Sequence, residues 1–158
     1  MKLADRVAAL EARVTALEGR SAAEAPAAEG ELWVLEGLRA RHPEPGAVVL
    51  AGSVRLPDDR ALEWQEGLET QALLDRDWAE TADLLGALGH PVRLALLQRF
   101  LGGATTAAEA GTGTTGQIYH HLRQLVAAGW LRSVGGGRYE VPPQRVVPLM
   151  SIVMGAHR

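Results

Sequence analysis

The sequence predicts a mainly α-helical protein with small β-hairpins, on the basis of three observations. Apolar residues recur at helical spacing along most of the 158-residue chain. Two short stretches instead alternate between apolar and polar residues on either side of a turn, as antiparallel hairpins do. Glycine and proline residues separate these stretches, so each element is short. In order, we expect a coiled coil over residues 1–20, a linker over 21–30, an accessory helix–hairpin–helix region over 31–83, a second helical domain with its own hairpin over 84–145, and a C-terminal helix over 146–158.

The composition is that of a soluble globular protein, with 47% hydrophobic and 22% charged residues. The absence of cysteine excludes disulfides, thiolate chemistry and cysteine metal sites, and fits a reducing compartment. No apolar run reaches the roughly 18 to 20 residues that span a bilayer, and the charged N-terminus does not resemble a signal peptide. We therefore expect a cytoplasmic protein with no membrane partner.

The net charge of −3 conceals an uneven distribution. Residues 1–85 contain nine basic and seventeen acidic side chains, a formal charge of −8. Residues 86–158 contain seven arginines and two glutamates, Glu109 and Glu140, a formal charge of +5. A basic domain joined to an acidic segment is typical of nucleic-acid-binding proteins, although chance clustering gives the same pattern.

Residues 1–20 have the heptad spacing of a coiled coil. The apolar positions repeat at intervals of four and three residues and comprise Leu3, Val7, Leu10, Val14 and Leu17. Valine at the a positions and leucine at the d positions favour a parallel two-stranded coil. We expect this helix to support a homodimer. The alternative is a helix that packs on its own domain, since fewer than three heptads are marginal alone.

The accessory region contains two helical stretches around a hairpin. Residues 31–41 have leucines at helical spacing, the alternating stretch turns at residues 57–60, and residues 73–88 predict one further amphipathic helix. The tryptophans of this region are Trp33, Trp64 and Trp78. We expect them in the core, and a ligand pocket is the alternative.

The second helical domain begins with a helix-turn-helix layout. Residues 91–101 start with proline and are apolar on most sides, so we expect a buried helix. Thr106 followed by Glu109 predicts a capping box that begins a very short helix. Thr114 followed by Gln117 predicts a second capping box that begins a longer one. Two helices joined by a short glycine-containing turn make up the helix-turn-helix motif.

The longer helix separates into two sides at about 100° per residue. The apolar side comprises Ile118, Leu122, Leu125 and Val126. The outer side comprises Gly116, Gln117, His120, Arg123, Gln124 and Ala127, and Tyr119 and His121 flank the apolar stripe. The outer side has hydrogen-bonding and cationic groups but no carboxylate, so it suits a negatively charged groove. Glutamine pairs with adenine, and arginine with guanine or phosphate.

A second hairpin follows this helix. Residues 130–134 and 138–141 alternate and are joined by three glycines. Arg132 and Arg138 lie on this hairpin. A basic hairpin directly after a helix-turn-helix is a wing, which reaches phosphates or the adjacent minor groove. Residues 84–145 therefore predict a winged helix-turn-helix domain that binds double-stranded DNA.

Three stretches of this domain resemble the ArsR-type family of winged-helix repressors. They read ALGHPVRLALLQRF, GTTGQIYHHLRQLVAAGWL and, after the glycine turn, RYEV. The resemblance covers about residues 84–145 and implies that the outer side of the longer helix enters the major groove. The residues that it implies for DNA contact are Thr114, Thr115, Gln117, Tyr119, His120 and Arg123, with Arg138 in the wing.

The C-terminal stretch and the missing cysteines bear on dimerisation and on metal binding. Residues 146–154 are almost wholly apolar and predict a dimer-forming helix, as the resemblance also implies, with contacts at Leu149, Ile152 and Val153. Many members of the family sense metals through cysteine sites, which this chain lacks. Adjacent histidines point about 100° apart on a helix, so His120 and His121 do not chelate one ion within one chain. We expect no metal and no cofactor, and the sequence leaves an unidentified small-molecule effector open.

The sequence contains no catalytic signature such as G-x-S-x-G or H-E-x-x-H, so we expect no enzyme activity. It predicts a sequence-specific DNA-binding regulator, a homodimeric repressor that places two helices in successive major grooves about 34–36 Å apart. The alternative is a protein–protein interaction module, in which the coiled coil and the acidic segment bind a partner and the winged helix serves as a scaffold.

Overall fold

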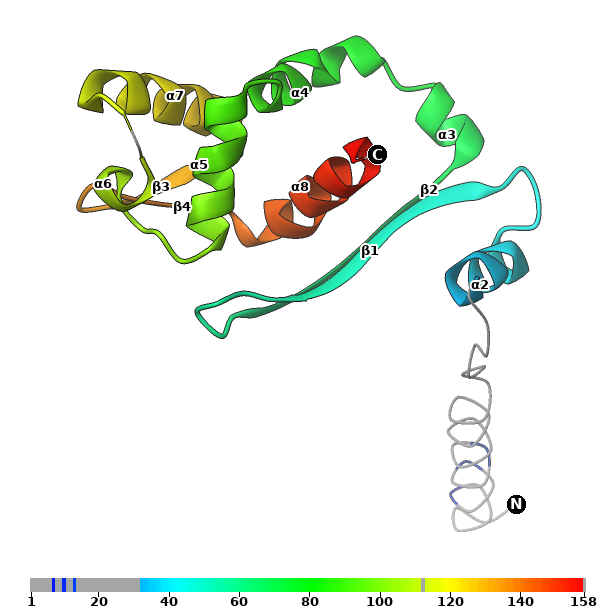
Figure 1. Ribbon diagram of the computed structural model, residues 1–158. Helices are drawn as coiled ribbons and strands as arrows, with labels where there is room; N and C mark the ends of the chain where they lie inside the picture. The colour runs from blue at the N-terminus through cyan, green and yellow to red at the C-terminus, as the bar shows by residue number, and fades with distance from the viewer. Residues whose placement is uncertain (1–6, 8–9, 11–12, 14–31, 112, 158) are drawn as a thin grey trace. The chain divides into compact units, whose positions relative to one another are not determined.

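The computed structural model describes residues 7, 10, 13, 32–111 and 113–157 (Figure 1). The chain divides into two compact units, Met1–Pro43 and Glu44–Arg158. The predicted linker and three predicted coiled-coil positions (Leu3, Val14 and Leu17) lie outside the described residues. The other two, Val7 and Leu10, are helical and exposed. The second unit combines helices with two small antiparallel hairpins, as the sequence predicts.

In the first unit, α2 (Trp33–Arg41) is the predicted helix after the linker. Of its large apolar side chains, Leu38 is half-buried and the others are exposed, with Trp33 57% exposed. The prediction that Trp33 is a core residue is therefore wrong for the residues that the structure describes. The helix ends where the Arg41 guanidinium donates to the Gly37 carbonyl (2.9 Å) and Pro43 follows.

The second unit begins with the accessory hairpin, β1 (Ala47–Arg55) and β2 (Ala61–Glu69). The strands pair in register from Ala47 opposite Glu69 to Arg55 opposite Ala61. The turn closes when the Leu56 N–H donates to the Arg60 carbonyl (2.9 Å). A two-stranded sheet is not stable alone, so one face of this hairpin needs a cover.

The predicted single helix over residues 73–88 is wrong. The structure has three short elements instead: α3 (Thr70–Leu74), the 3₁₀ helix η1 (Trp78–Thr81) and α4 (Ala82–Leu88). The break lies at Asp77, whose carboxylate accepts from the Ala79 N–H (2.9 Å) and so begins a new helix. Trp78 is 60% exposed and its indole donates to the Leu73 carbonyl (2.9 Å), so it is not a core residue either.

The three helices that the sequence predicts in this region are present as α5 (Pro91–Leu101), α6 (Ala107–Ala110) and α7 (Thr115–Ala127). His90 is the N-cap of α5, and its Nδ1 accepts from the Val92 N–H (3.2 Å). Against expectation, α5 is buried on one side only, since Val92 and Leu94 are 41% and 38% exposed.

The two predicted capping boxes have different outcomes. At α6 the box is complete: the Glu109 N–H donates to the Thr106 hydroxyl (3.3 Å), and the Glu109 carboxylate accepts from the Thr106 N–H (3.2 Å). At α7 the predicted box is not formed. The Thr114 hydroxyl instead donates to the amide oxygen of Gln117 (3.0 Å), so the two side chains bond each other rather than the backbone.

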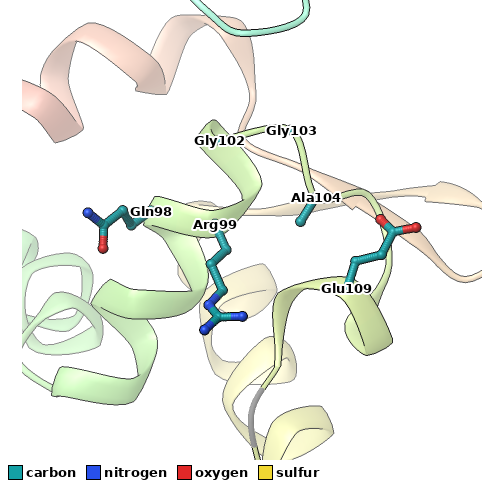
Figure 2. A pocket seen from close by; sticks show the side chains of 6 residues that line it. All are labelled: Gln98, Arg99, Gly102, Gly103, Ala104 and Glu109. Carbon is teal, nitrogen blue, oxygen red and sulfur yellow. The ribbon is translucent and has the colours of Figure 1, made fainter.

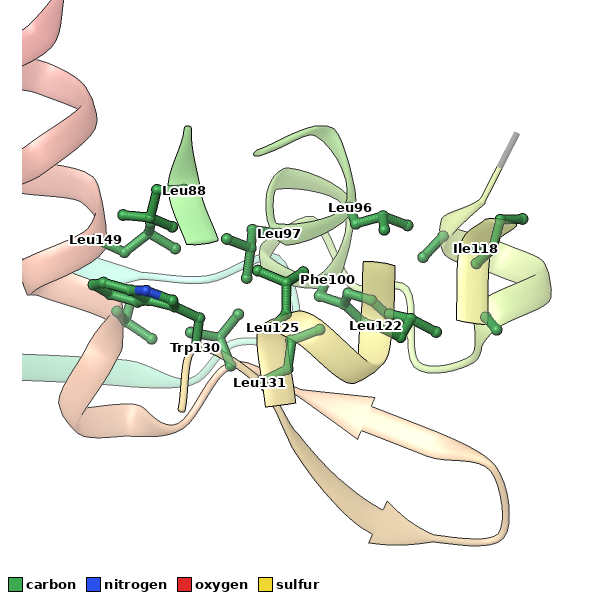
Figure 3. Close-up of a cluster of buried hydrophobic side chains, with 14 of the residues drawn as sticks. Leu88, Leu96, Leu97, Phe100, Ile118, Leu122, Leu125, Trp130, Leu131 and Leu149 are labelled. Atoms are coloured by element: carbon green, nitrogen blue, oxygen red, sulfur yellow. The ribbon is translucent and has the colours of Figure 1, made fainter. Parts of the chain in front are cut away.

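The core of the second unit joins α5, α7 and α8 to the accessory hairpin (Figure 3). Leu122 and Leu125 of α7 are fully buried and point toward Leu97 and Phe100 of α5. Leu56 from the hairpin turn belongs to the same core and is 4% exposed. The accessory hairpin therefore shares one core with α5, α7 and α8, and the second compact unit begins at Glu44.

The second hairpin, β3 (Arg132–Gly135) and β4 (Arg138–Glu140), is the predicted hairpin after α7. Gly135, Gly136 and Gly137 all have positive φ (87°, 61° and 73°), a conformation that L side chains rarely adopt. The base of the hairpin is fixed where the Tyr139 N–H donates to the Thr105 carbonyl (2.8 Å), beside α6.

The last helix, α8 (Pro143–Ala156), covers the accessory hairpin. A Cβ at Gly52 of β1 would lie 2.7 Å from the Val147 side chain, so glycine permits this close approach. Leu149 is 2% exposed within its own chain, so its prediction as a dimer contact is corrected: it is not available to a second chain. Ile152 and Val153 are 36% and 49% exposed and stay available. In the described part of the chain no helix has the length and apolar character needed to cross a membrane.

Candidate nucleic-acid interface

The helix α7 is held by one side and exposed on the other. Ile118, Leu122 and Leu125 are buried in the core, as predicted. Val126 is 37% exposed, so the apolar side is narrower than predicted. Gly111 lies close under α7, because a Cβ there would be 2.2 Å from the Ile118 side chain. This packing fixes which side of α7 faces outward.

The outward side of α7 brings the predicted DNA-contact residues together. All six predicted residues of this segment are exposed: Thr114, Thr115, Gln117, Tyr119, His120 and Arg123. No carboxylate occurs between Thr114 and Ala127. The hydrogen bond between Thr114 and Gln117 places a hydroxyl and an amide side by side at the first turn. This turn presents groups that both donate and accept hydrogen bonds.

The two arginines predicted to contact DNA have no acidic partner among the described residues. Arg123 donates from Nε to the Tyr119 carbonyl one turn earlier (3.3 Å), which directs its side chain along α7. Arg138 is exposed at the start of β4, and its backbone pairs with that of Thr106. Neither guanidinium forms an ion pair in the part of the chain that the structure describes. Both positive charges are therefore available to an anionic ligand.

The other arginine of the β3–β4 hairpin is neutralised. Arg132 donates from Nε to the Glu140 carboxylate across the hairpin (2.6 Å), and the two residues form an ion pair. Glu140 also lies 3.9 Å from the Arg60 guanidinium in the turn of the accessory hairpin. Among the described residues, the β3–β4 hairpin thus offers Arg138 as its unpaired cation, which is the arginine that the family resemblance implies for DNA contact.

Arg93 is a residue that the sequence analysis did not single out. Its guanidinium donates to the carbonyls of Ala87 and Gly86 (2.9 Å for the latter) at the end of α4, and to the amide oxygen of Gln124 (2.7 Å) in α7. These contacts link α4, α5 and α7 at one point. The signal in the sequence was weak, because the position of an arginine in an apolar helix does not reveal which neighbouring helix ends its side chain reaches.

The histidines at this junction are packed together. The ring centroids of His90 and His121 are 4.6 Å apart, and those of His120 and His121 are 5.6 Å apart. Burial lowers the pKa of His121, and the nearby His90, His120 and Arg93 lower it further. Within the described residues, no cluster of histidine, aspartate and glutamate is arranged to hold a metal ion.

Two hollows of the second unit lie away from the outward side of α7. An open hollow of about 520 Å³ is bordered by the end of α5 and by α6, with Arg99 and Glu109 on opposite sides (Figure 2). The Glu109 carboxylate is already bonded by Thr105 and Thr106, which lowers its pKa. The second hollow, of about 290 Å³, is lined almost wholly by apolar side chains of α5 and α8. The tryptophans of the accessory region line neither hollow.

Family models, curated proteins and solved structures were compared with the chain, and none of them matches it. Function is therefore inferred from the residues and geometry above.

Proposed function

We propose that this protein is a homodimeric transcription regulator that binds double-stranded DNA with α7 and the wing. The observation that carries the proposal is the outward side of α7, which has six exposed residues and no carboxylate, together with Arg138, which forms no ion pair among the described residues. Duplex DNA is a dense array of phosphates. Each cationic side chain on such a surface therefore increases the affinity for DNA, and no carboxylate on it repels the phosphates. The resemblance to ArsR-type repressors in the same residues supports repression.

In this proposal the two parts of the surface have different tasks. The outward side of α7 enters the major groove, where Gln117, His120 and Arg123 reach base edges or phosphates. Thr114, Thr115 and Tyr119 contact the sugar–phosphate backbone at the start and edge of the helix. Arg138 contacts the backbone from the wing and so positions the domain without reading sequence.

A protein-interaction module is the second candidate, and one observation favours it. In the first unit, Leu32, Trp33 and Val34 are three consecutive apolar residues that are all exposed at the start of α2. Exposed clusters of large apolar residues mark interaction surfaces in many proteins. This candidate assigns no role to the outward side of α7, so DNA binding distinguishes the two.

The test is fluorescence-anisotropy binding to duplexes from the protein's own upstream region, across a salt series. We expect tight binding to one pseudo-palindromic duplex and a steep loss of affinity with salt. Arg138→Ala should weaken binding to all duplexes and reduce the slope of log affinity against log salt by about one. Gln117→Ala should relax the preference at one base position, at about 1–3 kcal/mol.

The matched control is Arg76→Ala, which removes an exposed arginine from the segment between α3 and η1. It should bind every duplex as the parent does. Absence of binding at low salt, with the dimer shown to be intact, would favour the interaction module. If Arg138→Ala and Gln117→Ala both bound like the parent, the DNA surface would be misplaced.

A further inference from the structure

Three histidines gather at the point where α7 packs against the start of α5. We call His90, His120 and His121 the histidine cluster. His121 lies between the other two, with ring centroids 4.6 Å from His90 and 5.6 Å from His120. Its Nδ1 is buried and has no hydrogen-bond partner among the described residues. His120 is exposed on the outward side of α7, so the cluster reaches from the junction to the proposed DNA surface.

The surroundings of His121 are cationic or neutral. From α5 it faces His90 at the N-cap and the Arg93 guanidinium, and from α7 it faces His120 and the neutral Gln124. The α4 carbonyls at this junction already accept from Arg93. Among the described residues around His121 no carboxylate takes part, and only a hydrogen bond with the neutral Gln124 side chain favours its protonated form in the unbound protein.

We propose that the histidine cluster couples DNA binding to proton uptake, so that affinity for duplex DNA rises as the pH falls. The inference rests on the proposed function, since it requires that phosphates approach the outward side of α7. An approaching phosphate supplies the anion that the cluster lacks, and it stabilises the protonated form of His121. Linkage between two binding events is reciprocal. If bound DNA raises the proton affinity of the cluster, protonation of the cluster raises the affinity for DNA by the same factor.

Linkage sets the size of the effect. Each proton taken up on binding changes the affinity by at most about tenfold per pH unit. The pKa of His121 is lowered in the unbound protein, so this histidine is largely neutral at pH 7 and has a proton to gain. We expect the affinity to rise by about three- to tenfold between pH 7.5 and 6.0 at constant ionic strength.

The experiment measures binding of the full chain to its preferred duplex at pH 6.0, 6.5, 7.0 and 7.5, for the parent and three variants. His121→Gln should flatten the pH dependence. His90→Asn should reduce it while keeping a good N-cap for α5. His157→Gln, at an exposed position after α8, should retain the dependence of the parent. Calorimetric titration in two buffers of different ionisation heat counts the protons directly.

A stability measurement separates this coupling from a change in folding. Because the pKa of His121 is lowered in the folded state, the unfolded chain binds a proton first as the pH falls below about 6.5. The stability of the parent should therefore fall with pH in this window, while its affinity for DNA rises. His121→Gln should remove part of the stability loss in urea unfolding.

Each outcome is decisive. Equal pH dependence in the parent, His121→Gln and His90→Asn, or no proton uptake in the titration, would overturn the role of the cluster while leaving the proposed function intact. Failure to bind any duplex at every pH would overturn the proposed function itself.

Discussion

At the residue scale, a single missing side chain decides how α8 meets the accessory hairpin. Gly52 faces Val147, which is 3% exposed and belongs to a β-branched residue type with little rotamer freedom. Any side chain at position 52 must displace the helix or the valine. The sequence alone shows only a glycine in a strand, which is consistent with a bulge or a close approach.

We expect Gly52→Ala to lower the free energy of unfolding by about 1–3 kcal/mol, because overpacking forces buried side chains from their positions. Urea unfolding followed by circular dichroism measures this. The matched control is Gly86→Ala in α4, where a Cβ meets no atom within 4 Å and helix propensity favours alanine by about 1 kcal/mol. Equal effects of the two substitutions would show that α8 does not approach β1 as described.

At the scale of an element, local capping positions α6, and through α6 the wing. The capping box between Thr106 and Glu109 begins a helix of four residues, which is too short to persist on propensity alone. The same segment pairs with the wing at Arg138 and accepts a hydrogen bond from Tyr139. The cap therefore supports both the turn before α7 and the base of the wing.

Thr106→Ala should cost about 1 kcal/mol of stability, since it removes the hydroxyl that accepts from the Glu109 N–H. Thermal or urea unfolding measures the loss. Thr106→Ser retains the hydroxyl and should stay within about 0.5 kcal/mol of the parent. A loss as large in the serine variant would assign the effect to the methyl group and not to the cap.

At the scale of the whole molecule, the proposed regulator needs two copies to read two half-sites. Two segments are predicted to join them: the coiled coil over residues 1–20 and the exposed part of α8. Leu149 is buried in the core of its own chain. The predicted dimer contacts of α8 that remain exposed to a second chain are Ile152 and Val153. Of the dimer contacts predicted in α8, these two side chains are exposed and can be tested.

Ile152→Glu should raise the dimer dissociation constant by at least about tenfold, because it buries a charge in each half of a symmetric interface. Sedimentation velocity across a dilution series measures this. The control, Ser53→Glu, adds the same charge to an exposed position on the strand face opposite α8 and should leave the constant unchanged. Removal of residues 1–20 tests the coiled coil in the same assay, and an unchanged constant would argue against it.

The sequence by itself determined the local features of this protein. The start of α5 at Pro91, the N-cap of α6 at Thr106, the glycine turn of the second hairpin and the two sides of α7 follow from periodicity and capping, which act over a few residues. The structure contains each of them. The exposed candidate residues were predictable for the same reason, because the buried stripe of a helix fixes its opposite side.

Only the tertiary structure decided which faces meet. It placed Leu56 and Leu149 in one core, left Trp33 and Trp78 exposed, and brought Arg93 to Gln124 and His90 to His121. Burial and pairing of this kind depend on residues far apart in the chain, and hydrophobicity does not specify the partner of each face. Periodicity therefore revealed the surface of α7, while the contacts that hold α7 and surround its histidines came from the packing of α4 and α5.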